Sequence, residues 1–295
     1  MDLELIRGNT YYLKTPGSLV GVYRLAEGKC ILIDSGDRAG NAGLILDTLR
    51  QAGLKVQGII NTHAHADHCA GNHRIQAATN CDIYASALES YAIEEPMIGL
   101  YGLYSANPLR VLKNRFLLAE PSWVTYKVES DLTINGESFE ILDLRGHSAG
   151  QIGVVTPDGV LFAGDSLIQP AILDEFSFLY MIDIAGQLQT LEHLKPRPEI
   201  FFLAHGGIIP DVEYAIKRNR DLLDNMTGFI KNLLSVPLTR EQIIERTANE
   251  YNLILNRTQY FLVSSSISAY LSYLSDRREI RCYTENNLLQ FVGEK

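Results

Sequence analysis

The sequence predicts an α+β protein in which β-strands form a sheet sandwich with helices outside it. Segments rich in β-branched and aromatic residues, separated by Gly and Pro turns, dominate residues 3–33 and 124–167. Segments with helical periodicity lie between and after these regions. Clusters of His and Asp follow the expected strands, so we expect these side chains to meet at one edge of the sandwich.

The first part of the chain alternates strands with helices. We expect strands at residues 9–13, 19–25, 30–34, 56–61 and 81–84. Apolar residues recur with helical spacing in residues 42–52, and Gly53 follows them as a typical helix stop. Further helices are expected at residues 71–79 and 87–93.

The second part contains two hairpin signals. Asn135-Gly136 separates strand segments 132–134 and 138–142, and Asp158-Gly159 separates segments 152–155 and 160–163. Both dipeptides favour the tight turns that join antiparallel strands. After them we expect a helix at 184–194, a strand at 199–203 and a long helix at 211–234.

Two stretches lack a clear assignment of role. Residues 94–120 contain Pro, Gly and Tyr and interrupt the regular pattern, which fits a substrate lid or a dimer contact as well as a surface excursion with its own small core. Pro237 marks a boundary, after which residues 238–275 read as two or three helices and segments 279–283 and 288–292 as two strands. We therefore expect one domain at 1–236 and a module at 237–295.

The strongest chemical signal is Thr62-His63-Ala64-His65-Ala66-Asp67-His68, which holds three of the seven histidines of the chain. It follows the apolar segment 56–60 and precedes a helix entry. In an extended turn His63 and His65 fall on one side, while Asp67 and His68 start a helical turn and point elsewhere. A lone buried His is usually structural, but four donors at this density favour a metal site for zinc, iron or manganese.

Four further motifs complete a resemblance. They are Ile33-Asp34-Ser35-Gly36, Gly146-His147-Ser148-Ala149-Gly150, Phe162-Ala163-Gly164-Asp165-Ser166 and Ala204-His205-Gly206. Together with His-x-His-x-Asp-His, and in this order, they resemble the metallo-β-lactamase-fold metallohydrolases. The resemblance implies an αββα sandwich of two mixed β-sheets flanked by helices.

The resemblance also implies a set of metal ligands. The first metal would take His63, His65 and His147, the second Asp67, His68 and His205, and Asp165 would bridge the two; Asp34 would brace the metal loops. Two divalent ions, zinc before iron or manganese, would hold a bridging hydroxide as the nucleophile. Asp67 would orient this hydroxide or pass a proton to the leaving group.

The predicted reaction is hydrolysis of a small ester, thioester or lactone, because the ligand set resembles the glyoxalase II and lactonase branch. Relatives of the fold offer two alternatives, a phosphodiesterase or ribonuclease and a mononuclear iron persulfide dioxygenase. A non-catalytic partner-binding protein is a further class that the complete ligand set disfavours. Tyr180 is a candidate to hydrogen-bond a substrate carbonyl, although an aromatic packing role fits it better.

The helices and strands after residue 237 resemble a winged-helix module, which in other proteins often binds DNA. Residues 237–295 carry seven basic and seven acidic residues, so the module has no net positive charge. We therefore expect it to serve packing or formation of a homodimer. The whole chain has a net charge of −9, which weighs against nucleic acid as a partner without excluding it.

Composition sets the remaining expectations. No segment approaches the roughly 18 apolar residues of a membrane span, and the N-terminus has no secretory signal, so we expect a cytoplasmic protein with no membrane partner. The four cysteines form no C-x-x-C pair and are expected to be reduced. Cys69 adjoins His68 but fits a small apolar residue under the loop better than a ligand. His73 and His193 are expected to be structural.

Overall fold

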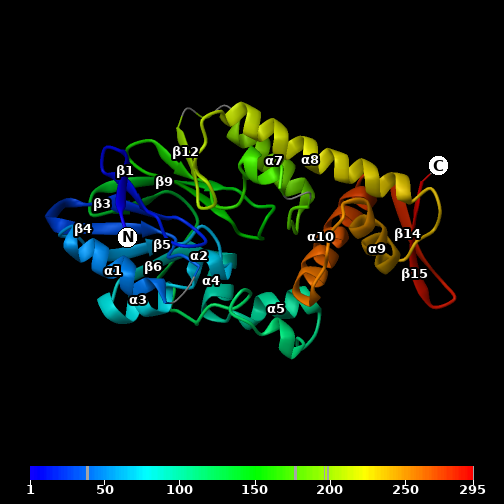
Figure 1. The fold of residues 1–295 in the computed structure, drawn as a ribbon, viewed down its shortest axis with the longest axis horizontal. Helices are drawn as coiled ribbons and strands as arrows, with labels where there is room; N and C mark the ends of the chain where they lie inside the picture. Colours follow the sequence, from blue (N-terminus) through cyan, green and yellow to red (C-terminus); the bar gives the residue numbers. More distant parts are fainter. Residues whose placement is uncertain (38–39, 176–177, 196, 198, 295) are drawn as a thin grey trace.

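Two β-sheets pack face to face and carry helices on their outer faces (Figure 1). The structure, a computed structural model, describes residues 1–37, 40–175, 178–195, 197 and 199–294. Lys295, one of the seven basic residues counted in the tail, lies outside the described residues. The layered arrangement confirms the expected α+β sandwich of two mixed sheets flanked by helices.

The first sheet contains seven strands of the described chain, in sequence order. They are β1 (Leu3–Arg7), β2 (Thr10–Leu13), β3 (Val20–Arg24), β4 (Lys29–Ile33), β5 (Lys55–Ile60), β6 (Asp82–Ser86) and β7 (Tyr126–Val128). Neighbours from β1 to β4 are antiparallel, and those from β4 to β7 are parallel. The parallel half requires crossover connections, and the carboxyl ends of its strands share one edge.

The second sheet has the order β13-β12-β11-β10-β9-β8 among the described residues. Its strands are β8 (Leu132–Ile134), β9 (Glu137–Asp143), β10 (Ile152–Val155), β11 (Val160–Phe162), β12 (Ile200–Leu203) and β13 (Gly207–Ile208). Ile134 pairs with Glu137 and Val155 with Leu161, so both expected hairpins form. The two-residue strand β13 was not expected, because it is too short to show a periodic pattern.

Three apolar layers hold the sandwich together. Phe139, Phe162 and Phe202 belong to the cluster between the sheets. The helices α1 (Asn41–Gln51) and α3 (Asn72–Thr79) cover the outer face of the first sheet, and α7 (Ile184–Leu194) and α8 (Val212–Leu233) cover that of the second (Figure 1). The helix α4 (Ala87–Glu94) directly follows β6. Each fully buried Phe, Leu or Ile side chain in these three clusters stabilises the folded state by about 1.5–3 kcal/mol.

Residues 94–120 form α5 (Met97–Tyr104) and the short helix η2 (Arg110–Leu112), which lie against the C-terminal part of the chain. The ring centroids of Tyr104 and Phe261 are 5.3 Å apart. Short elements elsewhere are η1 (Ala26–Gly28), α2 (Ala66–Cys69) and α6 (Pro170–Leu173). The segment is therefore packed on one side, and its role as lid or dimer contact stays a prediction.

The C-terminal part contains α9 (Arg240–Glu250), α10 (Arg257–Asp276) and a hairpin of β14 (Ile280–Glu285) and β15 (Leu288–Gly293), at the right of Figure 1. Capping boxes at Thr239 and Asn256 start the two helices. Ile243 and Ile267 belong to the same buried cluster as Leu191 and Ile216 of α7 and α8. The boundary at residue 237 and the winged-helix likeness stay predictions. Within the described residues, no helix has the length and apolar character needed to cross a bilayer.

Candidate metal centre

The predicted ligands converge in two groups at the edge where β4, β5, β9, β11 and β12 end. His63, His65 and His147 form group one; Asp67, His68, Asp165 and His205 form group two. In each group, one nitrogen or oxygen atom from every member lies within 4.8 Å of the others. The side chains that the sequence placed on separate motifs are thus brought together as expected, while their role as ligands stays a prediction.

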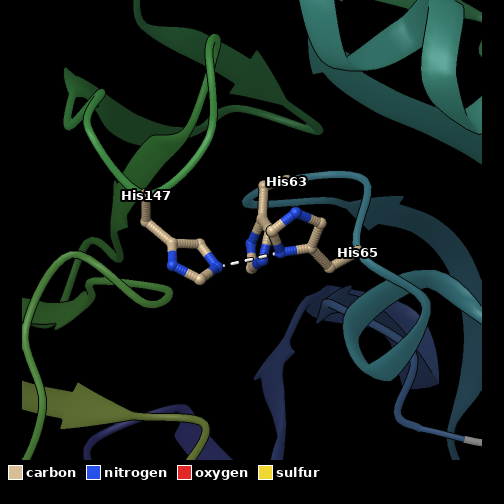
Figure 2. A group of neighbouring side chains, drawn as sticks. All are labelled: His63, His65 and His147. Carbon is tan, nitrogen blue, oxygen red and sulfur yellow. Dashed lines mark hydrogen bonds between the residues drawn. The ribbon is translucent and has the colours of Figure 1, made fainter. Parts of the chain in front are cut away.

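Group one joins two loops on opposite sheets (Figure 2). His63 and His65 follow β5, and their ring centroids are 4.6 Å apart. His147 follows β9, and its Nε2 lies 2.8 Å from Nδ1 of His65. The three imidazoles therefore face one small volume, which matches three-histidine zinc sites that leave a fourth position open.

Asp165 belongs to group two and also lies close to group one. One carboxylate oxygen, Oδ1, is 3.3 Å from Nε2 of His68 in group two. The other, Oδ2, is 3.5 Å from Nε2 of His147 in group one and 3.8 Å from Nε2 of His205. One carboxylate thus approaches members of both donor groups, and its role as a bridge between two ions stays a prediction.

Hydrogen bonds on the far side of the rings fix how three histidines face the groups. Nδ1 of His147 donates to the Tyr180 carbonyl at 3.0 Å, and Nδ1 of His205 donates to the Gly17 carbonyl at 3.0 Å. Nδ1 of His68 lies 2.8 Å from Oδ2 of Asp34. Because a carbonyl or carboxylate accepts the Nδ1 proton, each ring directs its Nε2 into the cluster, and this is the atom that can bind a metal once it carries no proton.

Asp34 also orients His63, through Thr62. The Thr62 hydroxyl donates to Oδ2 of Asp34 at 2.8 Å, and the Thr62 N–H donates to Oδ1 at 2.8 Å. The hydroxyl oxygen is then free to accept from Nδ1 of His63 at 3.1 Å. Asp34 holds this position with a φ of 62°, a backbone conformation that costs energy for a residue other than glycine.

Two buried imidazole nitrogens lack a hydrogen-bond partner within the part of the chain that the structure describes, and this bears on whether the donor groups fit a metal ion. Among the described residues, Nε2 of His63 and Nε2 of His68 have no partner in hydrogen-bond geometry, although both side chains are fully buried; Nε2 of His68 has only the ion-pair distance of 3.3 Å to Oδ1 of Asp165. Buried polar atoms are rarely left unpaired, because each costs about 1–3 kcal/mol. Both residues belong to the donor groups, and a metal ion there would satisfy these atoms. The donor set thus fits divalent ions that accept imidazole and carboxylate ligands.

Burial dominates the electrostatics of group one. It lowers the pKa of His63 well below its usual value, and the neighbouring His68 and His65 lower it further. Burial and the nearby His147 lower the pKa of His65 to about 4. Burial also lowers the pKa of His147, although Asp165 opposes this effect. All three imidazoles are therefore neutral near pH 7, which is the form that binds metal.

Carboxylates dominate group two. Burial alone lowers the pKa of His68, but Asp165, Asp34 and Asp67 outweigh it and raise the pKa well above its usual value. Burial acts in the same way on His205, and the hydrogen bond to Asp67 reverses the result, so its pKa is raised. Burial raises the pKa of Asp165, but the imidazoles of His68, His147 and His205 hold it well below its usual value. Without metal, group two thus pairs protonated imidazoles with carboxylates.

Backbone conformations that favour glycine aim two of the donors. Gly146, before His147, has a φ of +140°, and Gly164, before Asp165, has a φ of +53°. A Cβ atom at Gly146 would lie 2.5 Å from Oε1 of Gln187. These loops therefore combine positive φ with close packing, which side chains would disturb.

Other residues singled out in the sequence lie around the groups. The ring of Tyr180 is 5.7 Å from that of His65 and 5.6 Å from that of His147. Burial raises the pKa of the Cys69 thiol, which donates to the Ala64 carbonyl at 3.3 Å. Nδ1 of His73 lies 2.8 Å from the Pro121 carbonyl oxygen, and His193 is in the last turn of α7. Neither His73 nor His193 belongs to the two groups found among the described residues.

Sequence reasoning missed Thr62 and Gln151. Gln151 is fully buried, accepts from the Asp165 N–H at 3.2 Å and donates to the Leu144 carbonyl at 3.1 Å. No spacing pattern identifies these residues, because each acts on partners that are distant in the sequence. The one available signal was the position of Thr62 directly between a strand end and the first histidine.

The fold and the two donor groups define the class: a two-sheet α+β protein with His and Asp side chains gathered at the sheet edge in positions that suit metal binding. The sequence pattern of the Metallo-beta-lactamase superfamily matches residues 14–205, more than half of the chain. The chain belongs to the metallo-β-lactamase superfamily, as its motifs indicated.

Curated relatives share modest identity with the chain. A hydroxyacylglutathione hydrolase of Albidiferax ferrireducens is 28% identical over 145 residues, which cover 48% of this chain and 44% of that protein. Hydroxyacylglutathione hydrolase 2 of Vibrio vulnificus is 27% identical over 248 residues, 80% of this chain and 82% of that protein. For several such relatives the chain spans less than half of their length.

Solved structures share the fold over nearly the whole chain. A beta-lactamase domain protein from Burkholderia ambifaria has a TM-score of 0.76 at 14% identity and covers 99% of this chain and 94% of its own. A metallo-beta-lactamase family protein from Thermus thermophilus has a TM-score of 0.71 at 19% identity, with 97% and 98% covered. The shared fold thus includes the C-terminal helices.

Proposed function

We propose that this protein is a metal-dependent hydrolase that holds two divalent ions, most simply zinc, and cleaves a small ester, thioester or lactone. One observation carries the proposal. Seven imidazole and carboxylate donors form two groups, and Asp165 contacts members of both. This arrangement favours a two-ion hydrolase over a mononuclear iron oxygenase, which needs only one group of ligands.

Different side chains would bind the two ions. His63, His65 and His147 would hold the first ion; Asp67, His68 and His205 would hold the second, with Asp165 between them. Bound there, the ions would lower the pKa of a water molecule to near neutrality, supply hydroxide for attack and stabilise negative charge on the substrate.

Asp67 is the more exposed of the two carboxylates in group two. Its side chain is 36% exposed, whereas that of Asp165 is 11% exposed. Its Oδ2 lies 3.1 Å from Nε2 of His205, which fixes the position of the carboxylate. We propose that Asp67 orients the attacking oxygen and passes a proton to the leaving group. We propose further that Tyr180, whose ring lies beside those of His65 and His147, hydrogen-bonds the substrate carbonyl.

The names of the curated relatives support a thioester as the first substrate class to test, since several are hydroxyacylglutathione hydrolases. The test begins with elemental analysis of the purified protein without added metal. We expect about two ions per chain, followed by hydrolysis of at least one member of a panel of thioesters, lactones and aryl esters. Asp67→Asn should lower kcat, while His73→Asn, a histidine outside both groups, should leave it unchanged.

Three outcomes would overturn parts of this proposal. One iron ion per chain, with oxygen consumed in the presence of a persulfide, would replace the hydrolase with a mononuclear oxygenase. Cleavage of RNA or a phosphodiester without cleavage of the panel would replace the substrate class. No metal as purified and none taken up on reconstitution would remove the metal centre itself.

A further inference from the structure

Glu89 joins the two loops that carry group one. It lies in the first turn of α4 and is only 5% exposed. Its Oε2 accepts from the N–H of Ala64, the residue between His63 and His65, at 2.9 Å. Its Oε1 accepts from the hydroxyl of Ser148 at 2.7 Å and from the N–H of Gly150 at 2.8 Å, just after His147. One carboxylate thus binds both loops.

The local sequence would assign Glu89 a different task. Ser86 and Glu89 have the spacing of a capping box, in which the glutamate returns to the N–H of the cap residue. The Ser86 hydroxyl does accept from the Glu89 N–H at 3.3 Å, as a helix cap should. The carboxylate instead turns away from the helix to the ligand loops.

Close packing brings the His147 loop to this helix. A Cβ atom at Gly150 would lie 2.6 Å from the Ser86 hydroxyl oxygen and 2.9 Å from Cβ of Leu88. The loop therefore lies directly on the first turn of α4, where Glu89 reaches it. Because this helix follows β6 of the first sheet, the contact links the second sheet's ligand to the first sheet.

We propose that Glu89 is the positioning residue of group one: it sets the distance between the His63–His65 loop and the His147 loop and so governs metal affinity at that group. The inference rests on the proposed function, because it concerns the ion that group one would hold. Asp34 and Thr62 fix how the rings are turned, and a backbone hydrogen bond from the Ile152 N–H to the Thr62 carbonyl, at 2.9 Å, joins the chain segments next to the two loops. Glu89 adds three hydrogen bonds to the residues that flank the imidazoles themselves.

The substitution Glu89→Gln removes part of this hydrogen bonding without changing the size of the side chain. Glu89 accepts three hydrogen bonds from two N–H groups and one hydroxyl. An amide has one oxygen and one NH₂ group, so Glu89→Gln must place a donor against Ala64 or against Ser148 and Gly150. The N–H of Ala64 or that of Gly150 therefore loses its acceptor.

The experiment measures zinc affinity by equilibrium dialysis in two single-group proteins. His205→Asn leaves group one complete, and His147→Asn leaves group two complete. Loss of a hydrogen-bond partner behind a metal ligand typically costs about 10–100-fold in affinity. We expect that loss when Glu89→Gln is added to His205→Asn, and no change when it is added to His147→Asn.

Glu94→Gln is the matched control. Glu94 lies on the same helix and its Oε1 also accepts from a backbone N–H, that of Val124 at 3.2 Å, which lies outside the ligand loops. We expect it to change neither affinity. Ser148→Ala, which removes one donor and leaves the glutamate, provides a milder variant if Glu89→Gln does not fold, and should weaken only the group-one protein.

The outcomes separate this proposal from the broader one. Unchanged zinc affinity of the group-one protein would overturn the positioning role, as would an equal loss in both single-group proteins, which indicates general destabilisation. Failure of the unmodified chain to bind zinc would instead overturn the proposed function, before Glu89 is tested at all.

Discussion

The two donor groups lie side by side but differ in charge. Group one consists of three imidazoles whose pKa values are lowered, chiefly by burial. Group two pairs two carboxylates with imidazoles whose pKa values are raised by those carboxylates and Asp34. Near pH 7 and without metal, group one is neutral and ready to bind, whereas group two holds protons where an ion would sit.

Because of this difference in charge, the two groups should bind an ion with different affinities near pH 7. An ion entering group one meets free lone pairs, while an ion entering group two must displace protons from His68 and His205. We therefore expect group one to fill first and group two to fill more readily as the pH rises.

The largest effect is expected for Asp165→Asn, which alters the one side chain that contacts both groups. The amide removes a negative charge and places a donor against imidazole nitrogens. Hydrolysis should fall by more than the roughly 100-fold typical for loss of a partner behind a ligand, and metal content should fall below two ions. Normal activity with two ions bound would show that Asp165 does not link the groups.

Because the two groups differ in protonation near pH 7, they should release different numbers of protons when zinc binds. When zinc is added at pH 7 in weak buffer, His147→Asn, with only group two complete, should release more protons than His205→Asn, with only group one complete. The excess comes from His68 and His205, whose raised pKa values keep them protonated beforehand. Equal release, measured by titration to constant pH, would contradict the assigned charge states.

The same contrast predicts two opposite pH effects on the stability of the metal-free protein. The raised pKa values of His68 and His205 contribute stability that is present below about pH 6.5 and is lost as pH rises through their folded values. The lowered pKa values of His63 and His65 make stability fall below about pH 6.5, for His65 down to about pH 4. When a folded and an unfolded pKa differ by one, the free energy of unfolding changes by about 1.4 kcal/mol.

Denaturant unfolding of chelator-treated protein across pH 4–9 measures both effects. His205→Asn should flatten the alkaline decline, and His65→Asn should flatten the acidic one, with His73→Asn as the reference for removal of a histidine elsewhere. A decline on the same side of the pH range for both variants would contradict the contrast.

The smallest effect is expected for Thr62→Val. The valine keeps the shape but removes the hydroxyl between Asp34 and Nδ1 of His63. Zinc affinity of group one should fall about 10-fold, at the low end for such partners, while group two keeps the direct Asp34–His68 contact. An equal loss at both groups in calorimetric titration would show that Thr62 acts through the loop as a whole.

Much of the fold could be predicted because its signals are local. The Asn135-Gly136 and Asp158-Gly159 turns and the period of residues 184–194 are each contained within about a dozen residues, and the structure has the elements they indicate. The residues placed in the candidate site were found because His and Asp cluster at strand ends. Short or apolar elements such as β13 and α5 carry no such period.

The supporting residues could not be predicted, because their role exists only after folding. Thr62 meets Asp34 from 28 positions away, and Glu89 meets Ser148 from 59 positions away. In the sequence, Glu89 fits a helix cap and Thr62 an ordinary strand end. Likewise, residues beyond Pro237 fit a separate module, yet Ile243 and Ile267 share a buried cluster with α7 and α8.

Each donor group takes part of its members from each sheet: His63, His65, Asp67 and His68 follow β5, whereas His147, Asp165 and His205 follow strands of the second sheet. During synthesis on the ribosome, neither group can be complete before the second sheet's strands emerge, and group two waits for residue 205. An ion bound at either group would therefore hold the two halves of the sandwich together. A chain cut between β7 and β8 should reassemble from its two fragments more readily with zinc than without it.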